Sequence, residues 1–149
     1  MSSSPLLSPA TTGIILCCDD IVRPVHDWLS ELKDSSLNFA KDCGISFKET
    51  FVNTAVSKPT TETSPLAALH FRSLLLVGGT LELAVTQIAI QAILEGHDVF
   101  VLTDLVSTQS EIDKPVLLDR LRFRGVDIIT SAQARIELKS YPVDLQIND

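Results

Sequence analysis

The chain of 149 residues has little of what would assign it to several functional classes. No apolar run approaches the roughly 18 residues that a membrane-spanning helix needs. Lysine and arginine number 12 against 19 acidic residues, so the net charge is −7. A positive face is what binds nucleic-acid phosphates and anionic membranes. The sequence therefore predicts neither a nucleic acid nor a membrane as partner.

Cysteine is scarce as well, and the three present are Cys17, Cys18 and Cys43. An odd count with an adjacent pair is not a disulfide framework and indicates a reducing compartment, so we expect a cytoplasmic protein. The opening segment lacks the basic and apolar regions of a secretory signal. No zinc-ligand spacing and no nucleotide fingerprint occurs, so we expect no metal and no cofactor.

Apolar residues are abundant, at 45% of the chain with a mean hydropathy of +0.25. The length predicts one domain with a core large enough to need no disulfide. Such a composition without a membrane span indicates a buried parallel sheet, a subunit interface, or both. We expect residues 1–12 to be a flexible tail, residues 13–140 to form the domain, and residues 141–149 to be a C-terminal tail.

Short apolar runs alternate with helical patterns along most of the chain. The apolar runs predict buried strands, and one alternating run predicts a strand nearer the sheet edge. The strands are expected at 14–18, 45–52 (the alternating run), 74–77, 99–102 and 126–129. Helices are expected at about 24–43, 65–71, 81–95, 110–124 and 130–139.

This succession of strands and helices implies right-handed crossovers between parallel strands. The predicted fold class is α/β, a three-layer αβα sandwich with a mainly parallel, Rossmann-like sheet. Asp34 to Ser36 could interrupt and recap the first helix. Thr80 can cap the helix at 81–95, which is apolar nearly all round and is therefore expected to be buried by more than one neighbour.

Ligands of parallel sheets bind at the carboxyl ends of the strands. Those ends are predicted at Asp19, between Lys48 and Lys58, from Gly78 to Ala84, from Asp104 to Ser107, and at Thr130.

Several of these positions admit two interpretations. The turn at 78–80 could seat an anion on the following helix, but a tight strand-to-helix turn explains it more simply. Asp19 could be a catalytic carboxylate or the cap of the next helix, and the two are equally weighted. Cys18 could be a nucleophile, although a cysteine in a buried strand is usually inert. The arginines within 120–124 complement a helix dipole.

Residues 74–138 resemble the C-terminal half of the isochorismatase-like, or cysteine hydrolase, superfamily, most of all its isochorismatase-domain-containing subgroup. The shared order is a strand ending in glycine, a short turn, a long apolar helix and a strand ending in aspartate. A serine-rich loop, a helix ending in glycine and a further strand follow. The run at 14–20 more weakly resembles the family's first strand, and the segment after the second strand is shorter than in the family.

The resemblance implies roles for particular residues. In the family a cysteine attacks a carbonyl carbon, an aspartate accepts its proton and a lysine supports the charge. The aspartate corresponds to Asp19 and the cysteine to Ala84, which has no nucleophilic atom. The lysine corresponds to Lys48 or Lys58, and Lys58 is favoured because a lysine in mid-strand is awkward to bury.

The resemblance also implies a backbone geometry. The family's non-proline cis bond corresponds to Gly79–Thr80, and its oxyanion donors correspond to the backbone N–H groups of Thr80 and Ala84. The nicotinamidase branch holds a metal with aspartate and histidine residues, and this sequence has no such cluster.

The leading hypothesis is a pseudoenzyme that has lost its catalytic thiol. It would bind a small carbonyl or carboxylate ligand, or assemble into a homo-oligomer through apolar helical surface. The alternative is an active hydrolase of a small amide or ester, in which Asp19 and a lysine activate water or Cys17 or Cys18 replaces the thiol. Ribonuclease activity, a label that some relatives carry, is disfavoured by the acidic charge.

Overall fold

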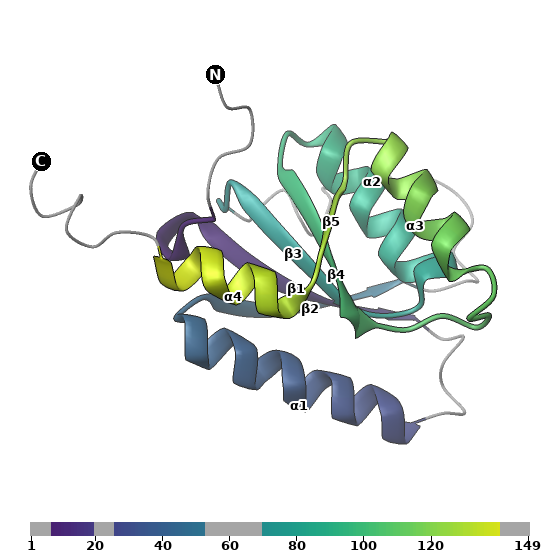
Figure 1. Cartoon of the computed structure of the whole chain (residues 1–149), viewed down its shortest axis with the longest axis horizontal. Helices are drawn as coiled ribbons and strands as arrows, with labels where there is room; N and C mark the ends of the chain where they lie inside the picture. Colours follow the sequence, from purple (N-terminus) through teal and green to yellow (C-terminus); the bar gives the residue numbers. More distant parts are fainter. Residues whose placement is uncertain (1–6, 20–25, 53–69, 141–149) are drawn as a thin grey trace, which may run out of the picture.

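The structure is a computed structural model that describes residues 7–19, 26–52 and 70–140, with the backbone alone described at 19, 26–29, 51 and 52. A five-stranded parallel sheet crosses the domain in the order β2-β1-β3-β4-β5 (Figure 1). The strands are β1 (Thr12–Asp19), β2 (Ser46–Val52), β3 (Ser73–Gly78), β4 (Asp98–Val106) and β5 (Asp127–Ile129). The predicted α/β class and parallel sheet are confirmed.

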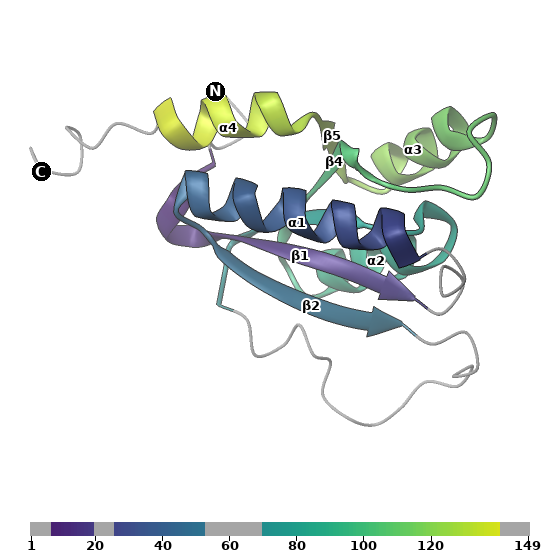
Figure 2. The same cartoon turned by 90° about the horizontal axis from the view of Figure 1, so that it is seen from below.

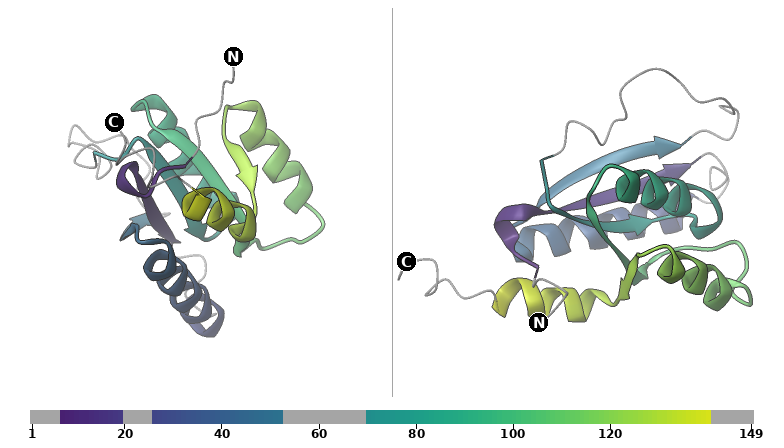
Figure 3. Two further views of the ribbon diagram at one scale, coloured as in Figure 1. Left: turned by 60° about the vertical axis from the view of Figure 1, so that its left-hand side comes forward. Right: turned by 90° about the horizontal axis from the view of Figure 1, so that it is seen from above.

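Helices cover both faces of this sheet, as the sandwich prediction requires (Figures 2 and 3). One face carries α1 (His26–Cys43) and α4 (Ser131–Ser140), which contact each other. The other face carries η3 (Leu81–Val85, a π-helical turn), α2 (Thr86–Leu94) and α3 (Lys114–Phe123). A short 3-10 turn, η1 (Pro9–Thr11), precedes β1.

Alternation along the central strands divides the core into two layers. Ile14 and Leu16 pack on the α1 side, whereas Ile15 and Cys17 pack on the α2 side. All six residues of β3 are buried, which explains why its sequence is a continuous apolar run rather than an alternating one. In the edge strand β2, Phe47 packs toward the α1 layer while Lys48 is exposed.

The folded domain begins earlier than the predicted boundary at residue 13. Leu7 is fully buried in the α1-side core, and η1 follows it directly. The remainder of the expected N-terminal tail, residues 1–6, and the expected C-terminal tail, residues 141–149, lie outside the described residues. So does nearly all of the helix expected at 65–71.

Two element predictions need correction. The first helix is not interrupted at Asp34 to Ser36, because α1 runs through them and buries Ser36. The strand expected to end at Leu102 continues to Val106, since Leu105 and Val106 are buried beyond the polar residues that suggested an end. By contrast, the expected cap at Thr130 is present, and its Oγ1 accepts a hydrogen bond from the N–H of Gln133 at 3.1 Å.

An ion-pair cluster joins the two helices of one face. Asp42 of α1 accepts hydrogen bonds from Lys139 and Arg135 of α4, both at 2.9 Å. The hydrogen bond from Lys139 is the main reason that the pKa of the Asp42 carboxyl lies below its ordinary value, and Arg135 adds to the effect. The guanidinium of Arg135 also lies 5.2 Å from the centre of the Phe39 ring.

We predict a pH-dependent contribution from this cluster. Because folding lowers the pKa of Asp42, the contribution is present above the carboxyl's unfolded pKa and is lost as the pH falls through the folded pKa. Urea unfolding of wild type and Asp42→Asn should therefore differ at pH 7 and converge in acid. A difference that persists unchanged at a pH below both pKa values would contradict this assignment.

Candidate functional site

The strand order places a switch point between β1 and β3. These strands are neighbours, but the chain leaves β1 toward α1 on one face and leaves β3 toward η3 and α2 on the other. In open parallel sheets, ligands bind outside the carboxyl ends of the strands at such a point. The family-matched positions Asp19, Gly79, Thr80 and Ala84 all follow or end one of these two strands.

The turn after β3 is joined to both neighbouring strands by backbone hydrogen bonds. The N–H of Gly79 donates to the carbonyl of Cys17 in β1 at 2.9 Å. On the other side, Ser107 donates its N–H to the carbonyl of Gly78 at 2.8 Å and accepts the N–H of Leu81 at 2.9 Å. The peptide bond between Gly79 and Thr80 is cis, as the resemblance implied.

Neither glycine of this turn has room for a Cβ atom. Gly78 has a φ of +93°, and a Cβ there would lie 2.7 Å from the carbonyl oxygen of Cys17. A Cβ on Gly79 would collide with Oγ of Ser107. The close approach of β1 and of the segment after β4 to this turn is sufficient to explain the Gly-Gly pair, without an anion.

Ala84 lies in η3, one turn after the cis bond. Its exposed fraction is 0%, and it belongs to the α2-side core together with Cys17 and Leu81. The π-type bond from the N–H of Val85 to the carbonyl of Thr80, 2.9 Å long, winds this turn more widely than an α-helix. The helix expected from Leu81 therefore begins as a π-helical turn. The side chain of Thr80 makes no capping hydrogen bond to this turn.

The acidic and basic partners expected from the family are described only in part. Asp19 ends β1, and its backbone pairs with Val52, two positions beyond the pairing of Cys17 with Gly78. Its side chain and the whole of Lys58 lie outside the described residues. Lys48 pairs with Ile15, four positions before Asp19, which is about 13 Å along the strand.

The three cysteines form no disulfide, and their surroundings differ. Cys17 is fully buried, with its Sγ 3.8 Å from the carbonyl oxygen of Ile15. Cys18 is half-buried, with its Sγ 3.8 Å from the carbonyl oxygen of Leu16. Burial raises the pKa of the Cys43 thiol, and nearby Asp42 raises it further, so this thiol is held in its unreactive protonated form.

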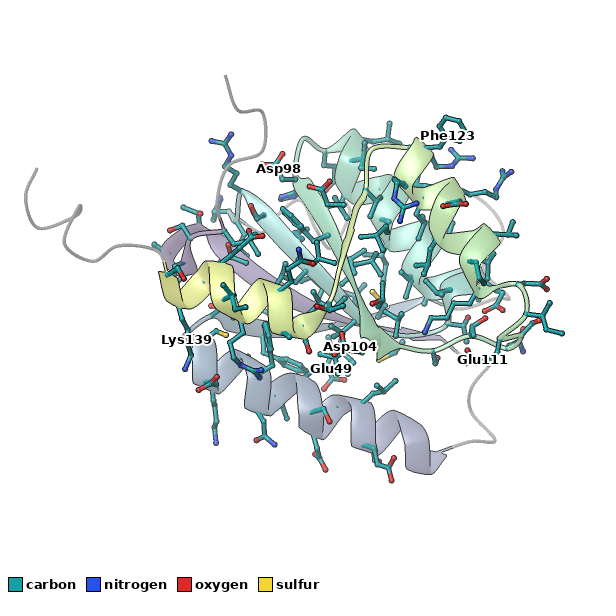
Figure 4. All side chains as sticks on the ribbon, viewed as in Figure 1. Glu49, Asp98, Asp104, Glu111, Phe123 and Lys139 are labelled. Carbon is teal, nitrogen blue, oxygen red and sulfur yellow. The ribbon has the colours of Figure 1, made fainter. Side chains whose placement is uncertain are left out.

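A cavity of about 400 Å³ opens on the α1 side of the carboxyl ends. It lies between α1 and the loop that follows β4, and Ala84 does not line it. Three carboxylates, Glu31, Asp104 and Glu111, are among its lining residues. Asp104 already accepts hydrogen bonds from the N–H (2.8 Å) and hydroxyl of Ser131 and so holds the start of α4 (Figure 4).

Glu82 organises the loop beside the turn, although no motif in the sequence marks it. Its Oε2 accepts hydrogen bonds from Thr108 Oγ1 at 2.5 Å and from the N–H of Gln109 at 3.0 Å. These bonds fix the loop that contains Ser107 against η3. An acidic residue in a first helical turn is a common signal, so the sequence offered nothing that distinguished this one.

Within residues 7–19, 26–52 and 70–140, no group of three or more His, Cys, Asp or Glu side chains could hold a metal ion. No helix of the described ranges has the length and apolar character needed to cross a bilayer.

No protein-family model and no curated protein sequence matches the chain. Solved structures do match it over most of its length. The YcaC gene product of Escherichia coli, described as an octameric hydrolase of unknown specificity, has a TM-score of 0.72 and 18% identity. That match covers 100% of this chain and 87% of the other.

Two further structures extend this result. The MAR1 ribonuclease of Caenorhabditis elegans has a TM-score of 0.71 at 14% identity, covering 97% of this chain and 91% of its own. An isochorismatase family protein of Burkholderia thailandensis has a TM-score of 0.65 at 15% identity, covering 93% and 100%. The chain thus has the isochorismatase-like hydrolase fold, and the resemblance seen in the sequence is confirmed at the level of fold.

We predict that Gly78→Ala destabilises the protein more than Gly96→Ala does. Both glycines have a φ of +93°, but a Cβ on Gly96 meets nothing within 4 Å, whereas one on Gly78 meets the Cys17 carbonyl. The unfavourable φ alone costs about 1–2 kcal/mol at either position. Urea unfolding should show a larger loss of unfolding free energy for Gly78→Ala than for Gly96→Ala. Equal losses would contradict the close packing of the turn against β1.

Proposed function

We propose that this protein is a catalytically silent member of the isochorismatase-like hydrolases that acts by binding and assembly. The proposal rests on Ala84, which the resemblance in sequence aligns with the family's nucleophile. A methyl group has no lone pair with which to attack a carbonyl carbon, so the covalent step cannot begin there. Ala84 is fully buried in the α2-side core beside Cys17, at the carboxyl end of β1.

The proposal retains part of the family's site for binding. Asp19 and a lysine would face a small carbonyl or carboxylate ligand at the switch point, beside the turn at Gly79 and Thr80. We favour Lys58 as that lysine, because Lys48 stands about 13 Å before the end of the sheet.

The proposal includes self-association in the cytoplasm. One matching structure, that of the Escherichia coli protein, is described as octameric. The odd count of three cysteines, two of them adjacent, supports a reducing compartment. The competing possibility, a hydrolase that uses Asp19 with a lysine or a strand cysteine, differs from the proposal in requiring turnover.

The first prediction from this proposal concerns turnover. Purified wild-type protein should hydrolyse p-nitrophenyl acetate and small amides no faster than buffer does, and Asp19→Asn should not change the rate. Alkylation of the thiols with iodoacetamide is the matching control for a cysteine-dependent activity. Hydrolysis that is lost in Asp19→Asn would contradict the pseudoenzyme proposal.

The retained binding site can be tested by restoring the sulfur. The structure of YcaC from Pseudomonas aeruginosa contains covalent acrylamide, and acrylamide is a small amide that adds to thiolates. In Ala84→Cys, peptide mass spectrometry should find residue 84 labelled by acrylamide before Cys17, Cys18 or Cys43. Ala84→Ser serves as the matched variant without a thiol. Labelling of the native cysteines alone, in a folded Ala84→Cys protein, would contradict a retained site.

The predicted lack of nucleic-acid binding gives a separate test. The Caenorhabditis elegans structure is described as a ribonuclease, but the net charge of −7 opposes phosphate binding by this chain. We expect no shift of single-stranded RNA in a gel even at low salt. Saturable binding that weakens steeply with added salt would overturn this expectation.

A further inference from the structure

The large hydrophobic side chains that stand exposed gather on one helix. Five such residues occur in the described part of the chain, and three of them, Ile112, Val116 and Phe123, belong to α3 or to the turn before it. Their exposed fractions are 88%, 59% and 95%. Val116 and Phe123 are seven residues apart in α3, which places them on one face of the helix, and Ile112 lies in the turn that precedes it.

This face points away from the domain. Leu121 on the opposite side of α3 is buried, and Leu117 and Leu118 pack against the α2-side core. Figure 4 shows Phe123 extending from the end of the helix away from the sheet. The stripe formed by Ile112, Val116 and Phe123, hereafter the α3 stripe, is therefore left without a partner among the described residues.

Charges are ordered along the same segment. It begins with exposed acids, Glu111 and Asp113, and ends with exposed bases, Arg120, Arg122 and Arg124. Asp113 is the N-cap of α3 and Arg124 its C-cap, and at 100° per residue both share one flank of the stripe with Arg120. Arg122 lies on the other flank, and Glu111 lies in the turn two residues before the N-cap. Acid at one end and base at the other makes the surface complementary to an inverted copy of itself.

We propose that the α3 stripe is a docking surface for a second copy of this chain, with the two α3 helices antiparallel about a two-fold axis. A two-fold contact must use the same patch on both copies, which this pattern satisfies. An axis centred between residues 117 and 118 sets Ile112 against Phe123 of the second copy. It also sets Asp113 between the second copy's Arg120 and Arg124.

One charge lies on the stripe itself. Asp119 falls between Val116 and Phe123 on the helical face, and an unpaired carboxylate there would oppose docking. Arg122 neutralises it within the chain through an ion pair of 2.5 Å. A single helix pair buries less than the roughly 800 Å² per partner of a standard interface, so we expect a dimer that dissociates on dilution.

The inference rests on the proposed self-association and names the surface that carries it. Sedimentation velocity over a concentration series should show wild type passing from monomer to dimer. Phe123→Glu should raise the dissociation constant by about tenfold or more, as expected for a buried aromatic anchor. Ile136→Glu is the matched control, because Ile136 is 65% exposed but lies on α4, across the sheet. It should leave the dimer unchanged.

A charge exchange tests the geometry without touching the apolar stripe. Asp113→Arg should weaken the dimer by like-charge repulsion with the second copy's Arg120 and Arg124. Adding Arg120→Asp and Arg124→Asp to the same chain should restore it, because every exchanged pair then meets its opposite across the axis. This test remains decisive even if Phe123→Glu fails to fold, which circular dichroism would reveal.

The outcomes separate the two proposals. A wild type that stays monomeric at all concentrations would overturn both the self-association and the α3 surface. Association that persists in Phe123→Glu and in Asp113→Arg would overturn the surface while leaving self-association in place. Disruption by Ile136→Glu alone would place the interface on α4 and likewise contradict the inference.

Discussion

The arrangement of the carboxyl ends of the sheet depends on the turn from Gly78 to Thr80. Backbone hydrogen bonds from this turn reach Cys17 in β1 and Ser107 after β4, so three chain segments meet at one place. Only glycine fits at the first two positions of the turn. The turn fixes where η3 begins, and η3 in turn sets Ala84 into the core on the side of the sheet that carries α2.

Much of this fold can be predicted from local pattern. Continuous apolar runs predict β1 and β3 because these strands are covered on both faces, and alternation correctly predicts β2 at an edge. The end of β4 is different, since Asp104 looks like a stop. Its carboxylate instead holds Ser131 of α4, a contact across 27 residues that no local rule anticipates. Leu7 escapes prediction for the same reason, because its burial depends on tertiary packing.

The candidate site, like the fold, combines features that the sequence predicts with features that depend on tertiary contacts. The cis bond between Gly79 and Thr80 follows from the resemblance and is present, whereas the assignment of Ala84 to the nucleophile position stays a prediction. The role of Glu82 in holding the loop around Ser107 depends on a contact across 26 residues, so it emerges only in three dimensions. The register of β2 sets Lys48 beside Ile15, in the middle of the strand, whereas Lys58 lies outside the described residues, so the choice of Lys58 stays a prediction.

If Ala84 occupies the position of a lost nucleophile, its methyl group lies next to Asp19, the acid that ends β1. A nuclear Overhauser cross-peak between the Ala84 methyl protons and the β-protons of Asp19 tests this most directly, in the unmodified protein. We predict that the cross-peak is present. Its absence, in spectra where Ala84 shows cross-peaks to Cys17 and Leu81 of its own core, would contradict descent of this site from a working hydrolase.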